Sequence, residues 1–226
     1  YLEGTTAPGA PRGNRFPTKS GKLEFWTEEL EEKFQPYGLS ALPEFYGEQE
    51  SLVNMPYMEI VDDDGEDGIL GPFASGGLAN RGRIVYSKEK GPGQILQEEG
   101  FILELVTGRP AAPHFHSWTH YSWQAQEMWP DLYVQIHPNT AKHSMISDGD
   151  LIIVETKHGK IKARAWLYAG IRENAVFLPI GWGERQPFSQ WDSVNFLTDK
   201  KQRDPISEQT NLKSLLCRIR PAKAKK

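Results

Sequence analysis

Six short apolar segments in the second half of the chain constrain its fold more than any other feature of the sequence. Each has the length of a β-strand rather than of a core helix, and little helical periodicity separates them. The 21 glycines and 16 prolines among the 226 residues also favour turns. The sequence therefore predicts a mainly β domain that forms a closed or nearly closed barrel. The segments are residues 101–106, 132–136, 151–156, 161–167, 175–178 and 215–219.

Two of these segments are predicted to form a hairpin. Residues 157–160 separate them, and Gly159 suits the positive φ that hairpin turns require. Within 161–167, apolar residues alternate with charged ones or tryptophan, as in a strand with one buried face. Cys217 lies in the last segment and is predicted to be a small buried apolar residue. As the only cysteine, it cannot form an internal disulfide or supply a Cys-rich zinc or iron–sulfur site.

The first hundred residues have a different character. We predict that residues 1–50 form an N-terminal arm and connector from a preceding domain, that 51–100 form an irregular acidic and Gly-rich insertion, and that 101–222 form the barrel. The acidic run at residues 62–67 raises the question of a calcium loop. Its register fails, because Asp67 stands where an EF-hand loop needs glycine, so a solvated acidic loop is favoured over a metal site.

Two local elements are predicted inside the N-terminal arm. Leu23 and Phe25 alternate with polar residues, which indicates a short strand. Thr27 precedes a run with glutamates in its first turn, and Leu30 and Phe34 are four residues apart, which indicates a short amphipathic helix with Thr27 as its N-cap.

Charge and hydropathy exclude several classes of protein. The net charge of −4 argues against a general nucleic-acid binder. No apolar run approaches the roughly 20 residues that span a bilayer, so direct membrane insertion is not expected. No targeting segment is recognisable, which leaves the localisation open. The chain begins with Tyr1 and not with Met, from which we expect a fragment that shares its function with missing sequence.

The densest polar cluster follows the first barrel segment. Gly108 allows close backbone approach, and Arg109 offers a planar set of donors to a phosphate. Hydroxyl groups follow a few residues later, so the loop is predicted to bind an anion. His114 and His116 lie on one side of an extended chain, and a metal site therefore stays open, although no third ligand is evident. Hydrogen bonding to a polar ligand is the favoured interpretation.

Three later residues are weaker candidates. Trp182 lies between two glycines. It would either stack on a flat heterocycle or cap the core, and the sequence favours neither role over the other. Asn195 lies in a capped turn that leaves its amide able to read a ring edge. Lys213 precedes the last segment and could meet a phosphate, although an ordinary surface lysine is the simpler interpretation.

Taken in order, these pieces resemble the C-terminal cofactor-binding domain of the dimethyl sulfoxide reductase family of molybdopterin oxidoreductases. The resemblance covers residues 18–25 and about 101–220. This sequence departs from the family at His137, where asparagine is usual, and at Met145, where glycine normally ends a short helix. The matching pieces are Thr18 to Phe25, Thr107-Gly108-Arg109 with His114-x-His116-Ser117-x-Thr119, His137-Pro138-x-x-Ala141, Asp148-Gly149-Asp150, Phe177-x-Pro179-x-Gly181-Trp182, Asn195-x-Leu197-Thr198, Asp204-Pro205 and Lys213-x-x-x-Cys217.

The resemblance implies a six-stranded double-psi β-barrel of the aspartate-decarboxylase-like kind, with short helices and an irregular N-terminal extension. It implies molybdopterin guanine dinucleotide in its bis form, with molybdenum or tungsten, and an iron–sulfur cluster only on the missing N-terminal part. No catalytic or metal-ligating residue is expected on this domain. The cofactor contacts implied are Thr107, Gly108, Arg109, His114, His116, Ser117, Thr119, Trp182, Asn195 and Lys213.

The implied function is cofactor binding within the catalytic subunit of a molybdenum or tungsten oxidoreductase. The whole enzyme would carry out two-electron or oxygen-atom transfer, and the isolated chain would not be catalytic. The implied partners are the remaining domains of that subunit and, beyond them, an electron-transfer subunit. One alternative is a non-catalytic β-barrel that has lost the cofactor and serves binding or assembly. A weaker alternative is a histidine-based metallohydrolase.

Overall fold

The structure is a computed structural model. It describes residues 16, 18–35, 40–42, 50–53, 57–61, 83–87, 91–115, 117–199 and 209–222, and describes the side chains of these outside 57–61, 83–87 and 117. The chain divides into two compact units, Tyr1–Tyr46 and Gly47–Lys226. Each is described by itself.

Among its described residues the first unit contains one short helix, α1 (Glu28–Phe34), as the sequence predicts. The Thr27 side chain accepts a hydrogen bond from Leu30 N at 3.1 Å, and three glutamates occupy the first turn. The strand predicted at residues 23–25 is wrong. Leu23 and Phe25 are 59% and 72% exposed, and no strand of this unit's described residues is available to pair with them.

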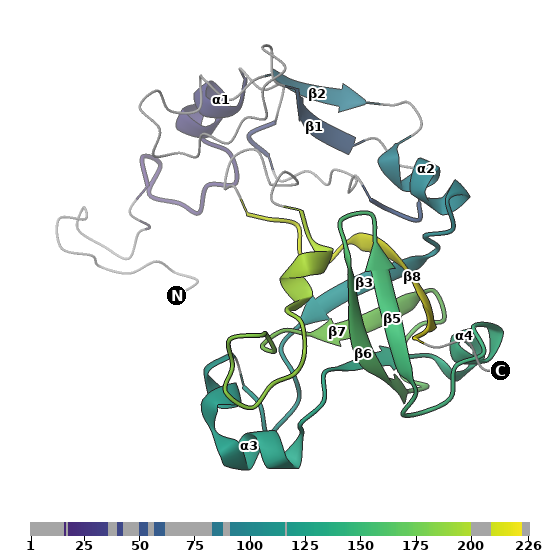
Figure 1. Ribbon diagram of the computed structural model, residues 1–226. Coiled ribbons are helices and arrows are strands. Elements are labelled where there is room, and N and C mark those ends of the chain that lie inside the picture. The colour runs from purple at the N-terminus through teal and green to yellow at the C-terminus, as the bar shows by residue number, and fades with distance from the viewer. Residues whose placement is uncertain are drawn as a thin grey trace. The chain divides into compact units, whose positions relative to one another are not determined.

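The second unit contains a closed six-stranded barrel, which confirms the predicted mainly β fold class (Figure 1). The strand order around the barrel is β3-β7-β4-β6-β5-β8. The pairs β3–β7 and β4–β6 are parallel, and the other four pairs are antiparallel. The strands are β3 (Leu103–Gly108), β4 (Tyr133–Ile136), β5 (Leu151–Thr156), β6 (Lys160–Leu167), β7 (Ala175–Pro179) and β8 (Leu215–Pro221).

The barrel interior is filled by every second side chain of the strands. In β6, Ile161, Ala163 and Ala165 are buried, whereas Lys162 and Arg164 between them are exposed, as their alternation predicts. The predicted hairpin also forms, because β5 and β6 pair antiparallel across the turn at 157–159, but Gly159 does not have the positive φ that the sequence suggested. Cys217 is fully buried, and burial raises the pKa of its thiol, so it is a neutral apolar core residue.

Three elements precede the barrel in this unit. An antiparallel hairpin joins β1 (Tyr57–Val61) and β2 (Arg83–Ser87), and α2 (Pro92–Glu98) buries Leu96 in a small apolar cluster. The prediction that 51–100 is wholly irregular is therefore wrong for these pieces. A long acidic and Gly-rich segment separates the two strands, so no local hairpin pattern reveals them. The acidic run at 62–67 lies outside the described residues.

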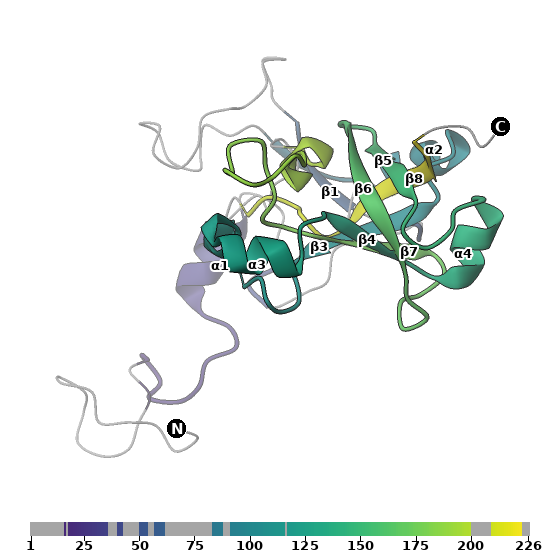
Figure 2. The ribbon, with the colours of Figure 1, turned by 60° about the horizontal axis from the view of Figure 1, so that its bottom comes forward.

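The two departures from the family pattern fall on α4 (Pro138–His143) and the turn after it. His137 caps this helix, since its Nδ1 accepts a hydrogen bond from Asn139 N at 3.2 Å, as an asparagine side chain would. Met145 has φ of 55°, the left-handed conformation that favours glycine at a helix C-terminus. In both views α4 lies on the opposite side of the barrel from α3 (Trp123–Met128) (Figures 1 and 2).

None of the described helices has the length and apolar character to cross a membrane.

Candidate functional site

The strand directions bring the predicted site segments to one end of the barrel. At this end β3 and β7 finish, while β4 and β8, which run antiparallel to β7 and β3 respectively, begin. The turn between β5 and β6 lies here too, because β6 runs parallel to β4. We call it the site end. The loop after β3, the turn after β7 and the turn before β8 therefore converge, although they are far apart in the sequence.

A buried hydroxyl ties the first of these segments to the last. The Thr107 side chain donates a hydrogen bond to the Leu212 carbonyl, and Ile180 N donates to the Gly108 carbonyl at 2.7 Å. A Cβ on Gly108 would lie 2.9 Å from the Phe177 ring, so there is little room for a side chain at this position. Thr107 thus holds the two segments together, and its hydroxyl is already engaged.

Two cations flank this contact. Arg109 and Lys213 are exposed, and neither forms an ion pair with any other described residue. The Arg109 guanidinium lies 5.2 Å from the centre of the Phe115 ring, which holds it at the start of the loop. Two exposed cations within a few residues of one hydrogen bond are groups that could bind an anion.

Asn195 lies in a short 3-10 helix, Val194–Leu197, beside the end of β5. The Ser193 side chain caps it by accepting from Asn195 N at 3.3 Å, and the Asn195 side chain is exposed. The Thr156 hydroxyl donates to the Leu197 carbonyl at 2.9 Å and so ties this turn to the barrel. The predicted capped turn is confirmed, and it presents to the surface an amide that has no side-chain hydrogen bond to another described residue.

Beneath the loop after β3 lies a group of buried polar side chains, which we call the histidine cluster: His114, His120, Gln126, Trp182 and Gln186. The rings of His114 and His120 stack 3.8 Å apart and 1° from parallel. His114 Nε2 donates to the Trp129 carbonyl at 3.0 Å, and the Gln126 amide donates to His120 Nδ1 at 3.1 Å. These hydrogen bonds assign the proton of His120 to Nε2. Burial, together with nearby His114, lowers the pKa of His120 to about 4, so this ring is neutral at pH 7.

The turn after β7 closes over the histidine cluster. The indole of Trp182 meets the two rings edge-on, at centroid distances of 4.2 Å to His120 and 5.2 Å to His114. Gly181 has φ of 126°, and a Cβ there would collide with His120 Nε2. The Gln186 amide donates to the Gly181 carbonyl. At 2% exposure, Trp182 packs as a cap on the core, although its N–H gains no partner there.

The histidine cluster is incompletely hydrogen-bonded. Among the described residues five of its buried atoms have no partner, and these comprise two N–H donors and three acceptors. Each such atom costs about 1–3 kcal/mol if it stays unsatisfied, and native proteins hold few of them. Five together indicate a place where a polar ligand or water completes the structure. The atoms are His114 Nδ1, His120 Nε2, Gln126 Oε1, Trp182 Nε1 and Gln186 Oε1.

The structure thus gathers most predicted site residues at one end but gives them different exposures. Arg109, Asn195 and Lys213 are exposed, while Thr107, His114 and Trp182 are buried. Thr119 is half-buried, and its hydroxyl accepts from Phe115 N at 3.0 Å, which holds the loop in shape. His116 and the side chain of Ser117 lie outside the described residues. No group of three potential metal ligands occurs within the described part of the chain.

Three members of the histidine cluster, His120, Gln126 and Gln186, were not among the site residues predicted from the sequence. For His120, its place in the same histidine-rich loop as His114 was the available signal. Gln126 lies in α3 and Gln186 in the turn after β7, and neither belongs to a pattern with chemical meaning. Only the folded chain brings these two amides to the histidines.

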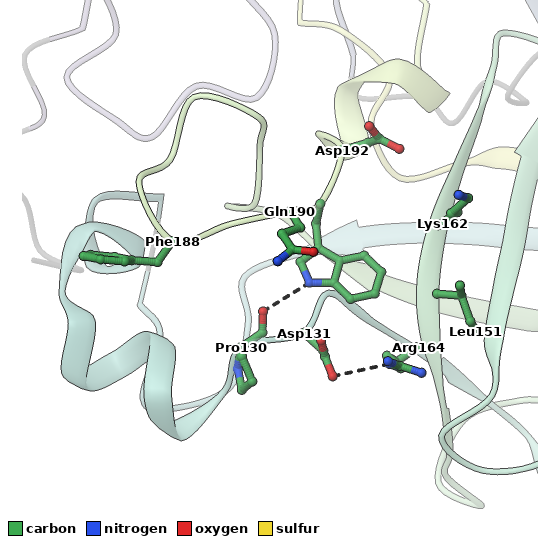
Figure 3. Close-up of a pocket in the computed structure, with 9 residues that line it drawn as sticks. Pro130, Asp131, Leu151, Lys162, Arg164, Phe188, Gln190 and Asp192 are labelled. Carbon is green, nitrogen blue, oxygen red and sulfur yellow. Dashed lines mark hydrogen bonds and ion pairs between the residues drawn. The ribbon is translucent and has the colours of Figure 1, made fainter.

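A separate cleft of about 510 Å³ lies along the outer face of β6 (Figure 3). Arg164 pairs with Asp131 at 3.4 Å, and Trp191 Nε1 donates to the Pro130 carbonyl at 3.2 Å. Its two basic and two acidic side chains balance, so it is not an evident phosphate site. None of the predicted contact residues lines it. The lining residues are Pro130, Asp131, Leu151, Lys162, Arg164, Phe188, Gln190, Trp191 and Asp192.

A closed mixed barrel with cations and unsatisfied polar groups at one end defines a ligand-binding β-barrel domain. The sequence model of the molydopterin dinucleotide binding domain matches residues 103–216, which include β3 to β7 and the first two residues of β8. The chain therefore belongs to the molydopterin dinucleotide-binding domain family.

Similar proteins agree with this assignment. A dopamine dehydroxylase of Eggerthella lenta is 35% identical over 127 residues, which are 53% of this chain and 12% of that protein. A putative formate dehydrogenase of Bacillus subtilis is 28% identical over 121 residues, 51% of this chain and 12% of that protein. Acetylene hydratase from Pelobacter acetylenicus has the same fold, with a TM-score of 0.64 and 18% identity over 94% of this chain and 25% of that chain. The alignments thus span only about an eighth of the curated relatives.

Proposed function

We propose that this chain is the C-terminal cofactor-binding domain of a molybdenum or tungsten oxidoreductase, and that its site end binds molybdopterin guanine dinucleotide. When bound, that group supplies the metal centre for two-electron or oxygen-atom transfer. The other domains of the same catalytic subunit would complete the cleft. An electron-transfer subunit is a further expected partner.

The observation that carries this proposal is the histidine cluster, in which five buried atoms have no partner in the part of the chain that the structure describes. Its donors and acceptors are of the kind that ring nitrogens, amino groups and carbonyls of a pterin or a guanine can satisfy. They lie under the loop that also carries Arg109, so the residues present fit a ligand with both polar rings and phosphates. A site of this kind contributes binding, orientation and electrostatics, while the cofactor supplies the chemistry.

Each exposed residue has a separate role in the proposal. Arg109 neutralises phosphate charge through a bidentate contact, and Lys213 does so as a point charge. Asn195 donates and accepts at a ring edge. Gly108 leaves room for the close approach of the backbone. His116 and Ser117 remain predicted contacts from the sequence.

The test is the metal and pterin content of the full-length protein that carries this chain, purified as variants. Arg109→Ala and Asn195→Ala should each lower the cofactor content about tenfold, because each removes a hydrogen bond to a charged or ring-edge group. Arg172→Ala is the matched control, since that arginine is 75% exposed and pairs with Glu104 at the opposite end of the barrel. Activity should fall in proportion to cofactor content.

An unchanged cofactor content in both variants would instead support the alternative, a barrel that has lost the cofactor and serves assembly. The metallohydrolase alternative makes a different forecast, because purified protein would then contain zinc. Absence of zinc removes that alternative.

A further inference from the structure

A carboxylate at the site end, that of Glu50, is buried against the β5–β6 turn and the start of β8. The Glu50 side chain has no exposed surface. Its Oε1 lies 2.7 Å from His158 Nε2, and its Oε2 accepts a hydrogen bond from Leu216 N at 3.1 Å. A carboxylate is retained in a protein interior only where such partners compensate its desolvation. The two oxygens of one residue therefore join the β5–β6 turn to β8.

The first oxygen acts on the segment that carries Asn195. His158 Nδ1 lies 3.9 Å from Asp199 Oδ2, so the imidazole lies between Glu50 and the residue just beyond the Asn195 turn. The neighbouring Gly159 packs so closely on the Phe196 carbonyl that a Cβ would collide with it. The turn held by Glu50 is thus the surface on which the Asn195 segment rests.

The second oxygen acts on the segment that carries Lys213. Asn211 Oδ1 accepts from Lys213 N and from Ser214 N, both at 3.2 Å, which shapes the turn before β8. Leu216 follows two residues after this turn, and its N–H is held by Glu50. The same carboxylate therefore holds the start of β8, and through it the turn that carries Lys213.

We propose that Glu50 is a positioning residue for cofactor binding, which sets the Asn195 and Lys213 turns relative to each other through His158 and Leu216 N. This inference rests on the proposed function, because it assumes that these two turns bind the cofactor. Glu50 itself does not touch the cofactor. Its contribution is to keep an amide and an ammonium at a fixed separation for one extended ligand.

The test measures cofactor content per folded full-length protein, with folding checked by circular dichroism. Glu50→Ala should lower the content about tenfold, as expected when two contacts to the ligand are both misplaced. Glu50→Gln should stay within about twofold of the parent, because an amide of the same shape can accept from Leu216 N and hydrogen-bond to imidazole. Glu104→Ala, which removes a 27% exposed carboxylate from its 3.4 Å pair with Arg172, is the control and should have no effect.

A second variant keeps the inference testable if Glu50→Ala does not fold. His158→Asn preserves a turn residue but withdraws the side chain from Glu50 and Asp199. His158→Asn should by itself lower cofactor content. Combined with Asn195→Ala, it should cause no further loss, because both changes act on the same contact. Combined with Lys213→Ala, the two fold-losses should multiply to within about twofold, as for independent sites. Such a pattern is not expected from a merely structural role, which would add to both.

The outcomes separate the two proposals. If Asn195→Ala and Lys213→Ala leave cofactor content unchanged, the proposed function fails. If they lower it while Glu50→Ala matches Glu104→Ala, only the positioning role fails. A loss in Glu50→Ala that Glu50→Gln does not restore, or full additivity of His158→Asn with Asn195→Ala, also overturns the positioning role.

Discussion

The barrel buries two histidine-containing polar groups, and they differ in how completely they are hydrogen-bonded. In the Glu50–His158 pair, both carboxylate oxygens are engaged and the imidazole lies between two carboxylates. In the histidine cluster, five buried atoms have no partner among the described residues. Both groups are shielded from solvent, so burial alone does not distinguish them.

The difference separates side chains that position the chain's own segments from side chains that are available to a ligand. A buried polar group that is satisfied within the chain stabilises one arrangement of its neighbours, and this is the role of Glu50 and His158. A buried group that the chain leaves unsatisfied reduces stability until another molecule completes it. Substitutions in the first group should therefore affect folding most, and substitutions in the second should affect ligand binding most.

The largest expected effect on stability comes from breaking the satisfied pair. His158→Ala leaves the buried Glu50 carboxylate without its imidazole partner, and this should lower the free energy of unfolding by about 3–5 kcal/mol. Urea denaturation of the cofactor-free protein measures it. Arg172→Ala, which breaks an exposed pair, should cost less than about 1 kcal/mol. Equal losses in the two variants would contradict the distinction.

The next effect is a pH dependence of stability that originates in the histidine cluster. The folded pKa of His120 is about 4, below its ordinary value of 6.5, so between these values the unfolded chain binds the additional proton. Stability is therefore complete above pH 6.5 and should fall by about 3 kcal/mol as the pH drops to 4. His120→Gln should remove this part of the slope in urea denaturation curves recorded from pH 4 to 7. An undiminished slope would show that His120 is not its source.

A smaller effect tests whether the cluster is indeed unsatisfied. Trp182→Phe removes an unpartnered N–H, and the relief of that donor offsets the lost packing, so the free energy of unfolding should stay within about 1 kcal/mol of the parent. The matched control is Trp191→Phe, which loses a hydrogen bond from Nε1 to the Pro130 carbonyl. The loss of this hydrogen bond should by itself lower the free energy of unfolding of Trp191→Phe by about 1 kcal/mol. Thermal unfolding of both variants decides between gain and loss.

The smallest expected effect is that of a substitution at Met145, which belongs to neither polar group. It serves as a reference for the size of the other stability changes. Met145 is 74% exposed and has a left-handed φ, so Met145→Gly should relieve backbone strain and raise the free energy of unfolding by about 0.5–1 kcal/mol. Cofactor content should not change. A destabilised variant would mean that the strain at this turn is smaller than the entropy that glycine adds to the unfolded chain.

Much of the barrel could be predicted from the sequence because its determinants are local. The alternation in 161–167 predicted the bounds of β6 to within one residue of those observed. The apolar run at 151–156 predicted the observed bounds of β5. The predicted strand at 23–25 failed because a strand needs a partner, and two alternating apolar residues do not supply one. The β1–β2 hairpin was missed for the opposite reason, since its partners are separated by a long segment.

The candidate site could be predicted only where a residue's chemistry is evident by itself. Arg109, Asn195 and Lys213 were found as exposed polar groups in turns. The meeting of Gln126 and Gln186 with His120, and the link from Glu50 to His158, depend on which segments the closed barrel brings together. Such long-range contacts leave no periodic trace in the sequence.

The most direct test of the central claim is an experimental structure of the cofactor-loaded full-length protein. We expect cofactor atoms within hydrogen-bond distance of Arg109, Asn195 and Lys213. We also expect cofactor, or water that bridges to it, at the histidine-cluster atoms that have no partner among the described residues. A cofactor bound away from the end where β3 and β7 finish, with those atoms still unpartnered, would contradict it.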